Sequence, residues 1–107
     1  GVFCDIDGTL IFWKPKKVDG KFQITPHLNQ EVVDFLHDLE AEGKTVLLWT
    51  GGNAEATKEK ISHFDLPWKI VSKDNYRGRA VEIAIDDEGL DTYNIQAKKL
   101  YLYAKGE

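Results

Sequence analysis

The chain has 107 residues, which suits a single domain over residues 1–107, and 42% of them are hydrophobic, enough for a buried core. Its net charge of -4 argues against a protein that coats nucleic acid with its whole surface and leaves room only for a local basic patch. The single cysteine, Cys4, excludes an internal disulfide, and no stretch approaches the roughly 20 apolar residues that span a bilayer. We therefore expect a cytoplasmic protein that has no membrane partner.

The chain begins with a predicted strand and a small flap. Residues 1–6 are a short apolar run that ends in acidic residues, which is typical of a buried parallel strand. Residues 11–24 are mixed in character and contain Pro15 and the pair Asp19-Gly20. Because Asp-Gly between apolar residues is a strong turn signal, this segment predicts a small hairpin or flap.

The rest of the chain alternates between predicted helices and strands. Thr25-Pro26 indicates a helix start, with Thr25 as N-cap and Pro26 at the first helical position, and Gly43 indicates its end. Asn53 caps a second predicted helix. Apolar runs predict further strands at residues 45–49, 69–72 and 81–85. Residues 100–104 fit either a fifth strand or the end of a helix, and their short alternation of Leu and Tyr favours the strand. This alternation predicts an α/β fold, a three-layer, Rossmann-like open parallel sheet with helices on its faces.

Acidic and hydroxyl side chains follow three of the predicted strands at the point where each ends. They are Asp5 and Asp7, Thr50, and Asp86 and Asp87. In open parallel sheets, ligands bind outside the carboxyl ends of the strands. Four carboxylates in one crevice repel one another unless a cation shares the site, and hard oxygen ligands suit Mg²⁺. The sequence therefore predicts a magnesium site at this edge of the sheet.

These polar residues fall in short motifs that occur in a fixed order. Residues 5–9 read Asp-Ile-Asp-Gly-Thr, residues 48–52 read Leu-Trp-Thr-Gly-Gly, and residues 83–87 read Ile-Ala-Ile-Asp-Asp. They resemble the first, second and fourth motifs of the haloacid dehalogenase-like (HAD) hydrolases, and Lys73 is the best match to the basic third motif. The resemblance runs from residue 2 to about residue 91 and implies an aspartate-nucleophile phosphatase. The segment between the first two motifs is too short for a folded cap domain, which points to the capless (C0-type) branch.

The resemblance implies a role for each motif residue. Asp5 would attack phosphorus and form an aspartyl-phosphate, and Asp7 would serve first as general acid and then as general base. Thr50 and the backbone N–H groups near Gly51 would hold the non-bridging phosphate oxygens. Lys73 would neutralise phosphate charge and steady the nucleophile.

A metal site is also implied by the resemblance. Mg²⁺ would be held by Asp5, the backbone carbonyl of Asp7 and the pair Asp86-Asp87. Which member of that pair contacts the metal directly stays open. Asp91 fits equally well as a residue behind the metal ligands or as a helix N-cap.

The basic partner of the nucleophile has rivals nearby. Lys73 is followed by Asp74 where the family often has proline, and Arg77 and Arg79 are the other basic residues of this region. The sequence therefore favours Lys73 without deciding among the three.

Aromatic and basic residues interleave in the predicted flap. They are Phe12, Trp13, Lys14, Lys16, Lys17, Lys21 and Phe22. Such a surface can stack a base and attract phosphate. In the alternative interpretation, the flap is a solvated hairpin whose aromatic residues cover the edge of the sheet.

The sequence as a whole predicts a magnesium-dependent phosphomonoester hydrolase. The flap favours a nucleotide or a polynucleotide end as substrate, and a phosphorylated sugar handled by a homo-oligomer is the alternative. A non-catalytic magnesium-binding or phosphoacceptor module is a further alternative. Asp7 favours the enzyme, because a stable phosphoacceptor does not need a general acid two residues after the phosphorylated aspartate.

Overall fold

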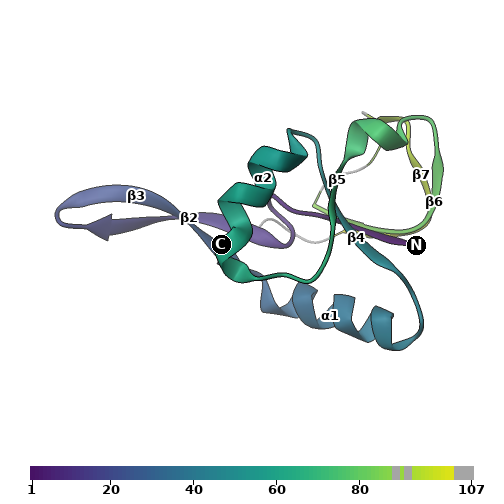
Figure 1. The fold of residues 1–107 in the computed structure, drawn as a ribbon, viewed down its shortest axis with the longest axis horizontal. Coiled ribbons are helices and arrows are strands. Elements are labelled where there is room, and N and C mark those ends of the chain that lie inside the picture. The colour runs from purple at the N-terminus through teal and green to yellow at the C-terminus, as the bar shows by residue number, and fades with distance from the viewer. Residues whose placement is uncertain (88–89, 91–92, 103–107) are drawn as a thin grey trace.

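A five-stranded parallel sheet forms the centre of the computed structural model, which describes residues 1–87, 90 and 93–102 (Figure 1). Its strand order is β5-β4-β1-β6-β7. The strands are β1 (Val2–Asp5), β4 (Val46–Thr50), β5 (Ile70–Ser72), β6 (Ala80–Asp86) and β7 (Gln96–Leu102). The chain moves outward from β1 to β4 and β5, then crosses back to β6 and β7 on the other side. This reversal beside β1 creates the switch point at which open α/β sheets bind their ligands.

Both α helices pack on one face of this sheet. Val32 and Leu36 of α1 (Gln30–Ala41) and Ile61 of α2 (Ala54–Ile61) share a buried cluster with Cys4 and Leu48 of the sheet. A short 3-10 helix, η1 (Ser62–Phe64), follows α2.

The opposite face is covered by a second buried cluster. Tyr76 of the 3-10 helix η2 (Lys73–Tyr76), Leu90 and Ile95 pack there against Phe3 and Trp49. Crossovers between parallel strands are right-handed, so the direction in which the chain moves across the sheet decides which face a connection covers. The chain reverses this direction after β5, and the connections before and after β5 therefore cover opposite faces. The prediction of helices on both faces therefore holds only in part: the second face of the described chain carries η2 and loop residues, but no α helix.

The predicted start of the first helix is wrong. Thr25 and Pro26 belong to β3 (Lys21–Leu28), and α1 begins at Gln30 after the N-cap Asn29. β3 pairs with β2 (Ile11–Val18) along its whole length, and the Thr25 hydroxyl donates to the Lys14 carbonyl over 3.3 Å. Cross-strand pairing thus overrides the local capping signal, and the flap extends over residues 11–28 instead of 11–24.

The predicted turn and helix-end signals are confirmed. Asp19 and Gly20 have φ values of 51° and 76°, and positive values at both positions define the turn that joins two twisted strands tightly. Gly43, with φ of 88°, donates its N–H to Glu40 O after α1, and Lys44 N–H bonds Leu39 O. This pair of bonds is the Schellman ending that favours glycine.

The second helix also begins where the sequence predicts. The Asn53 side chain accepts from Ala56 N over 3.0 Å and so caps α2. In the part of the chain that the structure describes, neither α1 nor α2 has the length and apolar character needed to cross a membrane.

Candidate functional site

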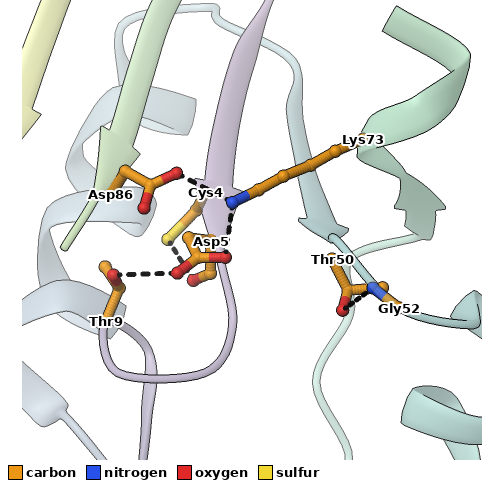
Figure 2. A network of polar contacts seen from close by, with 7 residues as sticks. All are labelled: Cys4, Asp5, Thr9, Thr50, Gly52, Lys73 and Asp86. Carbon is orange, nitrogen blue, oxygen red and sulfur yellow. Dashed lines mark hydrogen bonds and ion pairs between the residues drawn. The ribbon is translucent and has the colours of Figure 1, made fainter. Parts of the chain in front are cut away.

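A buried ion-pair cluster lies at the carboxyl ends of β1 and β6. Lys73 Nζ is 3.0 Å from Asp5 Oδ1 and 3.0 Å from Asp86 Oδ2, and all three residues are buried. Figure 2 shows the Lys73 side chain reaching from η2 to a point between the two carboxylates. The order of the strands explains the meeting, since β6 pairs directly with β1 and brings Asp86 next to Asp5.

The position of Lys73 is fixed by the end of β5. The Ser72 side chain accepts from Asp74 N over 3.2 Å, which caps η2 and starts the turn at this point. The Lys73 ammonium group then lies 5.8 Å from the centre of the Trp49 ring and 5.4 Å from that of the Tyr93 ring. These aromatic neighbours favour a cation, so Lys73 is held in place by rings as well as by carboxylates.

Burial and charge set the protonation of this cluster. The pKa of Asp5 is raised to about 7, chiefly by burial and then by the nearby Asp86 carboxylate, while Lys73 opposes the shift. Burial alone would lower the pKa of Lys73, but the charges of Asp5 and Asp86 outweigh it and raise that pKa. Lys73 is therefore a permanent cation, whereas Asp5 is sensitive to any further positive charge in the site.

Three carboxylates are placed so that they could hold such a charge. One carboxylate oxygen from each of Asp5, Asp86 and Asp87 lies within 4.8 Å of the others. Asp5 and Asp86 are buried and Asp87 is half-buried, so the group faces little competing water. Several oxygen ligands of negative charge fit Mg²⁺ better than a soft metal.

The loop after β1 turns tightly and places the Thr9 hydroxyl next to Asp5, the predicted nucleophile. Gly8 has φ of 84°, which L side chains rarely adopt, and its N–H donates to Ile11 O over 2.9 Å. Thr9 is fully buried, and its Oγ1 donates to Asp5 Oδ2 over 3.3 Å. Thr9 is the last residue of the motif at residues 5–9, and its bond to Asp5 could not be predicted from the sequence.

Asp7 lies outside the buried cluster. Its side chain is exposed, and Asp7 Oδ1 accepts from the indole Nε1 of Trp13 over 2.8 Å. The carboxylate is therefore not among the three grouped oxygens, and the role predicted for its backbone carbonyl stays a prediction. The sequence did not predict the bond to Trp13, although only the five residues 8–12 separate Trp13 from Asp7.

Thr50 ends β4 on the other side of β1, and Gly51 follows it. Thr50 is buried, and its Oγ1 accepts from Gly52 N over 3.2 Å, a turn that leaves the hydroxyl proton to be donated elsewhere. Figure 2 shows Thr50 across from the Asp5 cluster. A Cβ added at Gly51 would overlap the hydroxyl of Tyr93, so this ring lies over the backbone that the sequence assigns to phosphate. Tyr93 is a site residue that no sequence motif indicated.

The rival basic residues lie further out. Arg77 is exposed, and its Nε lies 2.7 Å from Asp74 Oδ1 while its guanidinium group stacks 4.8 Å from the centre of the Tyr93 ring. Arg79 is also exposed. Lys73 is thus the basic residue that the structure places against Asp5. Asp91 lies outside the described residues.

Cys4 lies directly beneath the site in β1. It is fully buried, and its thiol contacts the Asp5 carbonyl at 3.3 Å. Burial raises the pKa of this thiol, and the charges of Asp5 and Asp86 raise it further. Because the thiolate is the nucleophilic form, Cys4 is an inert core residue.

Comparison with family models, with curated proteins and with solved structures gave no match to this chain.

Proposed function

We propose that the protein is a magnesium-dependent phosphomonoester hydrolase that forms an aspartyl-phosphate on Asp5. The observation that carries this proposal is the position of Lys73, which lies 3.0 Å from both Asp5 and Asp86 at the switch point of the sheet. The resemblance to HAD hydrolases supports it, because the motif residues of three separate segments meet there. The strand order and the small hairpin are compatible with a Rossmann-like, capless member of that superfamily.

The first chemical step uses Asp5 and Asp7. An Asp5 carboxylate oxygen attacks phosphorus in line, and the bond from phosphorus to the leaving oxygen breaks as the new bond forms. Asp7 gives its proton to that leaving oxygen, and the product alcohol departs. Trp13 occupies Oδ1 of Asp7, so we assign the proton transfer to Oδ2.

The second step returns Asp5 to its carboxylate form. Asp7, now ionised, takes a proton from a water molecule that attacks the phosphorus of the aspartyl-phosphate. The bond between phosphorus and the Asp5 oxygen breaks, and inorganic phosphate leaves. Lys73 stabilises negative charge on Asp5, and the Trp13 N–H holds the Asp7 carboxyl group in position.

Asp5, Asp86 and Asp87 would hold Mg²⁺, which supplies positive charge against the carboxylate nucleophile and the phosphate group. Lys73 adds a second, permanent positive charge beside Asp5. The Thr50 oxygen accepts from Gly52 N–H, and its hydroxyl proton would be donated to a phosphate oxygen.

Phosphate release from a panel of phosphoesters tests the proposal. The panel holds an aryl phosphate, mononucleotides, oligonucleotides with a 3′- or 5′-phosphate, and sugar phosphates, each with Mg²⁺ and with chelator. We expect release that needs Mg²⁺ and is abolished in Asp5→Asn, while the matched control Asp38→Asn, at an exposed position on α1, stays active.

Two results would contradict this assignment. Normal turnover by Asp5→Asn would show that another group is the nucleophile. Stable phosphorylation of Asp5 by a small phosphodonor, with no release from any ester, would identify a phosphoacceptor module instead.

A further inference from the structure

The β2–β3 hairpin projects from the body of the protein as a two-faced arm (Figure 1). Residues directly opposite one another in an antiparallel pair share a face, so the register defines both faces. The apolar face carries Trp13, Pro15, Phe22, Ile24 and Pro26, with Lys17 at its outer end. The basic face carries Lys14, Lys16 and Lys21, together with Phe12.

The apolar face is open to solvent. Phe22 is 77% exposed and Ile24 is 71% exposed, and neither belongs to a buried cluster of the described chain. Large apolar side chains gathered on a projecting element mark a binding surface more often than they serve the fold. A two-stranded hairpin alone is at most marginally stable in water, so a ligand that covers these side chains would stabilise it.

The charge of the hairpin identifies the chemistry of that ligand. Residues 11–28 hold four lysines and one aspartate, whereas the whole chain has a net charge of -4. The hairpin is therefore a positive arm on an acidic molecule and attracts a polyanion, while the body repels it. Lysines stand on both strands next to aromatic rings, which is the pattern that binds phosphates and stacks bases.

One contact joins the hairpin to the proposed catalytic residues. Trp13 stands on the apolar face, 38% exposed, and its Nε1 donates to Asp7 Oδ1 over 2.8 Å. The surface that runs from Trp13 to Phe22 therefore begins at the general acid. Strands of eight residues extend roughly 25 Å, so a substrate that uses the whole face must be much longer than a sugar phosphate.

We propose that the hairpin binds a single strand of nucleic acid and guides its terminal phosphate to Asp5. This inference rests on the proposed phosphatase activity and names its substrate class. Bases stack on Trp13 and Phe22 of the apolar face, and Lys17 on that face neutralises phosphate between them. The long side chains of the basic-face lysines reach the remaining phosphates around the edges of the two-stranded arm. A lipid or a peptide would use the apolar face, but neither explains why a positively charged arm, with four lysines and one aspartate, stands on an acidic chain.

Binding and turnover are measured separately to test this. Fluorescence anisotropy follows the binding of a labelled single strand of about 12 nucleotides with a terminal phosphate to Asp5→Asn, in Mg²⁺, so that no hydrolysis interferes. We expect Phe22→Ala, placed in that background, to weaken binding about tenfold, because stacking on one ring is lost. Phe22 is exposed, so its truncation leaves the fold intact, which circular dichroism checks.

Salt dependence tests the role of the lysines. Each phosphate contact on a single strand adds about 0.7 to the slope of log affinity against log salt. The pair Lys16→Ala/Lys17→Ala should therefore reduce the slope by about 1.4. The control pair Lys60→Ala/Lys98→Ala removes the same charge from exposed positions of α2 and β7. It should change the slope of log affinity against log salt much less than the hairpin pair does.

The outcomes separate this inference from the proposed function. Hydrolysis of an aryl phosphate in the otherwise native chain, together with oligonucleotide binding that is equal in Phe22→Ala and the control pair, overturns the inference and keeps the phosphatase. Oligonucleotide binding that depends on the hairpin, with no hydrolysis of any ester, overturns the phosphatase and keeps the binding surface. Absence of oligonucleotide binding, with a dimer in sedimentation that Phe22→Ala dissociates, assigns the apolar face to a second copy and overturns the inference.

Discussion

Lys73 Nζ lies 3.0 Å from Asp5 Oδ1, and the two side chains are each only 9% exposed. The same ammonium group bonds Asp86, so replacing Lys73 by methionine leaves two buried carboxylates facing one another. Breaking a buried ion pair in this way costs about 3–5 kcal/mol. We expect Lys73→Met to lower the free energy of unfolding by about that amount in chelator, and Mg²⁺ to restore part of it. Urea denaturation with and without Mg²⁺ measures both effects.

Arg79→Met is the matched control for this experiment. Arg79 is a basic residue of the same region, but it is exposed, and exposed substitutions usually change stability by about 0.5 kcal/mol or less. Equal destabilisation by the two variants would mean that the Lys73 ion pairs contribute nothing specific.

The raised pKa of Asp5 predicts a pH dependence of stability. Burial raises this pKa from 3.8 to about 7, so between these values the folded chain holds more protons than the unfolded chain. The stabilising contribution of protonated Asp5 is complete below pH 3.8 and is lost as the pH rises to about 7. In chelator, the free energy of unfolding should therefore decrease from pH 5 to pH 8 more steeply in the native sequence than in Asp5→Asn, which cannot titrate. Parallel curves for the two proteins would contradict the raised pKa.

The bond from Trp13 to Asp7 predicts an effect on the rate of phosphoester hydrolysis. Trp13→Phe keeps a ring but removes the N–H that holds Asp7 Oδ1, and a hydrogen bond to a charged group contributes about 1.5–3 kcal/mol before any allowance for solvent. Because the site is exposed, we expect kcat for an aryl phosphate to fall about tenfold, with KM little changed. Asp7→Asn should lower kcat by about 100-fold or more.

The double variant shows whether Trp13 acts through Asp7. In an Asp7→Asn background, Trp13→Phe should have almost no further effect on kcat, since the group that it positions is already gone. A full additional tenfold loss would show that Trp13 acts on the substrate directly.

The strands and their acidic ends could be predicted from sequence because both signals are local. β1 and β6 are apolar runs that end in Asp5 and Asp86, and parallel strands bring their carboxyl ends to one edge. The Asp19-Gly20 turn is local in the same sense, because its positive φ values depend on two adjacent residues. The sequence could therefore predict that the side chains at the carboxyl ends of β1 and β6 lie close together, but it could not predict the distances between them.

The features that the sequence did not predict depend on partners far along the chain. Thr25-Pro26 has the local form of a helix start, but pairing with Trp13 and Lys14 makes it a strand. The choice of Lys73 over its neighbours depends on where β5 ends, since the side chain must emerge towards Asp5 at the first residue of η2. No periodicity or motif carries that information.

Tyr93 is the clearest example of such a long-range contact, and it gives a further prediction. The φ angle of Gly51 is not positive, so the backbone conformation does not require glycine at this position. Glycine instead leaves the space that the Tyr93 side chain occupies. A Cβ there would overlap the Tyr93 hydroxyl but would lie 3.4 Å from the ring carbon that bears it, which is close to ordinary contact.

We expect Gly51→Ala to lower the free energy of unfolding by about 1–2 kcal/mol, as in other overpacked sites. In a Tyr93→Phe background the same substitution should cost less than about 0.5 kcal/mol, because the overlapping oxygen is absent. Urea denaturation of the four proteins measures this coupling, and an equal cost in both backgrounds would show that Tyr93 does not lie over Gly51 in solution.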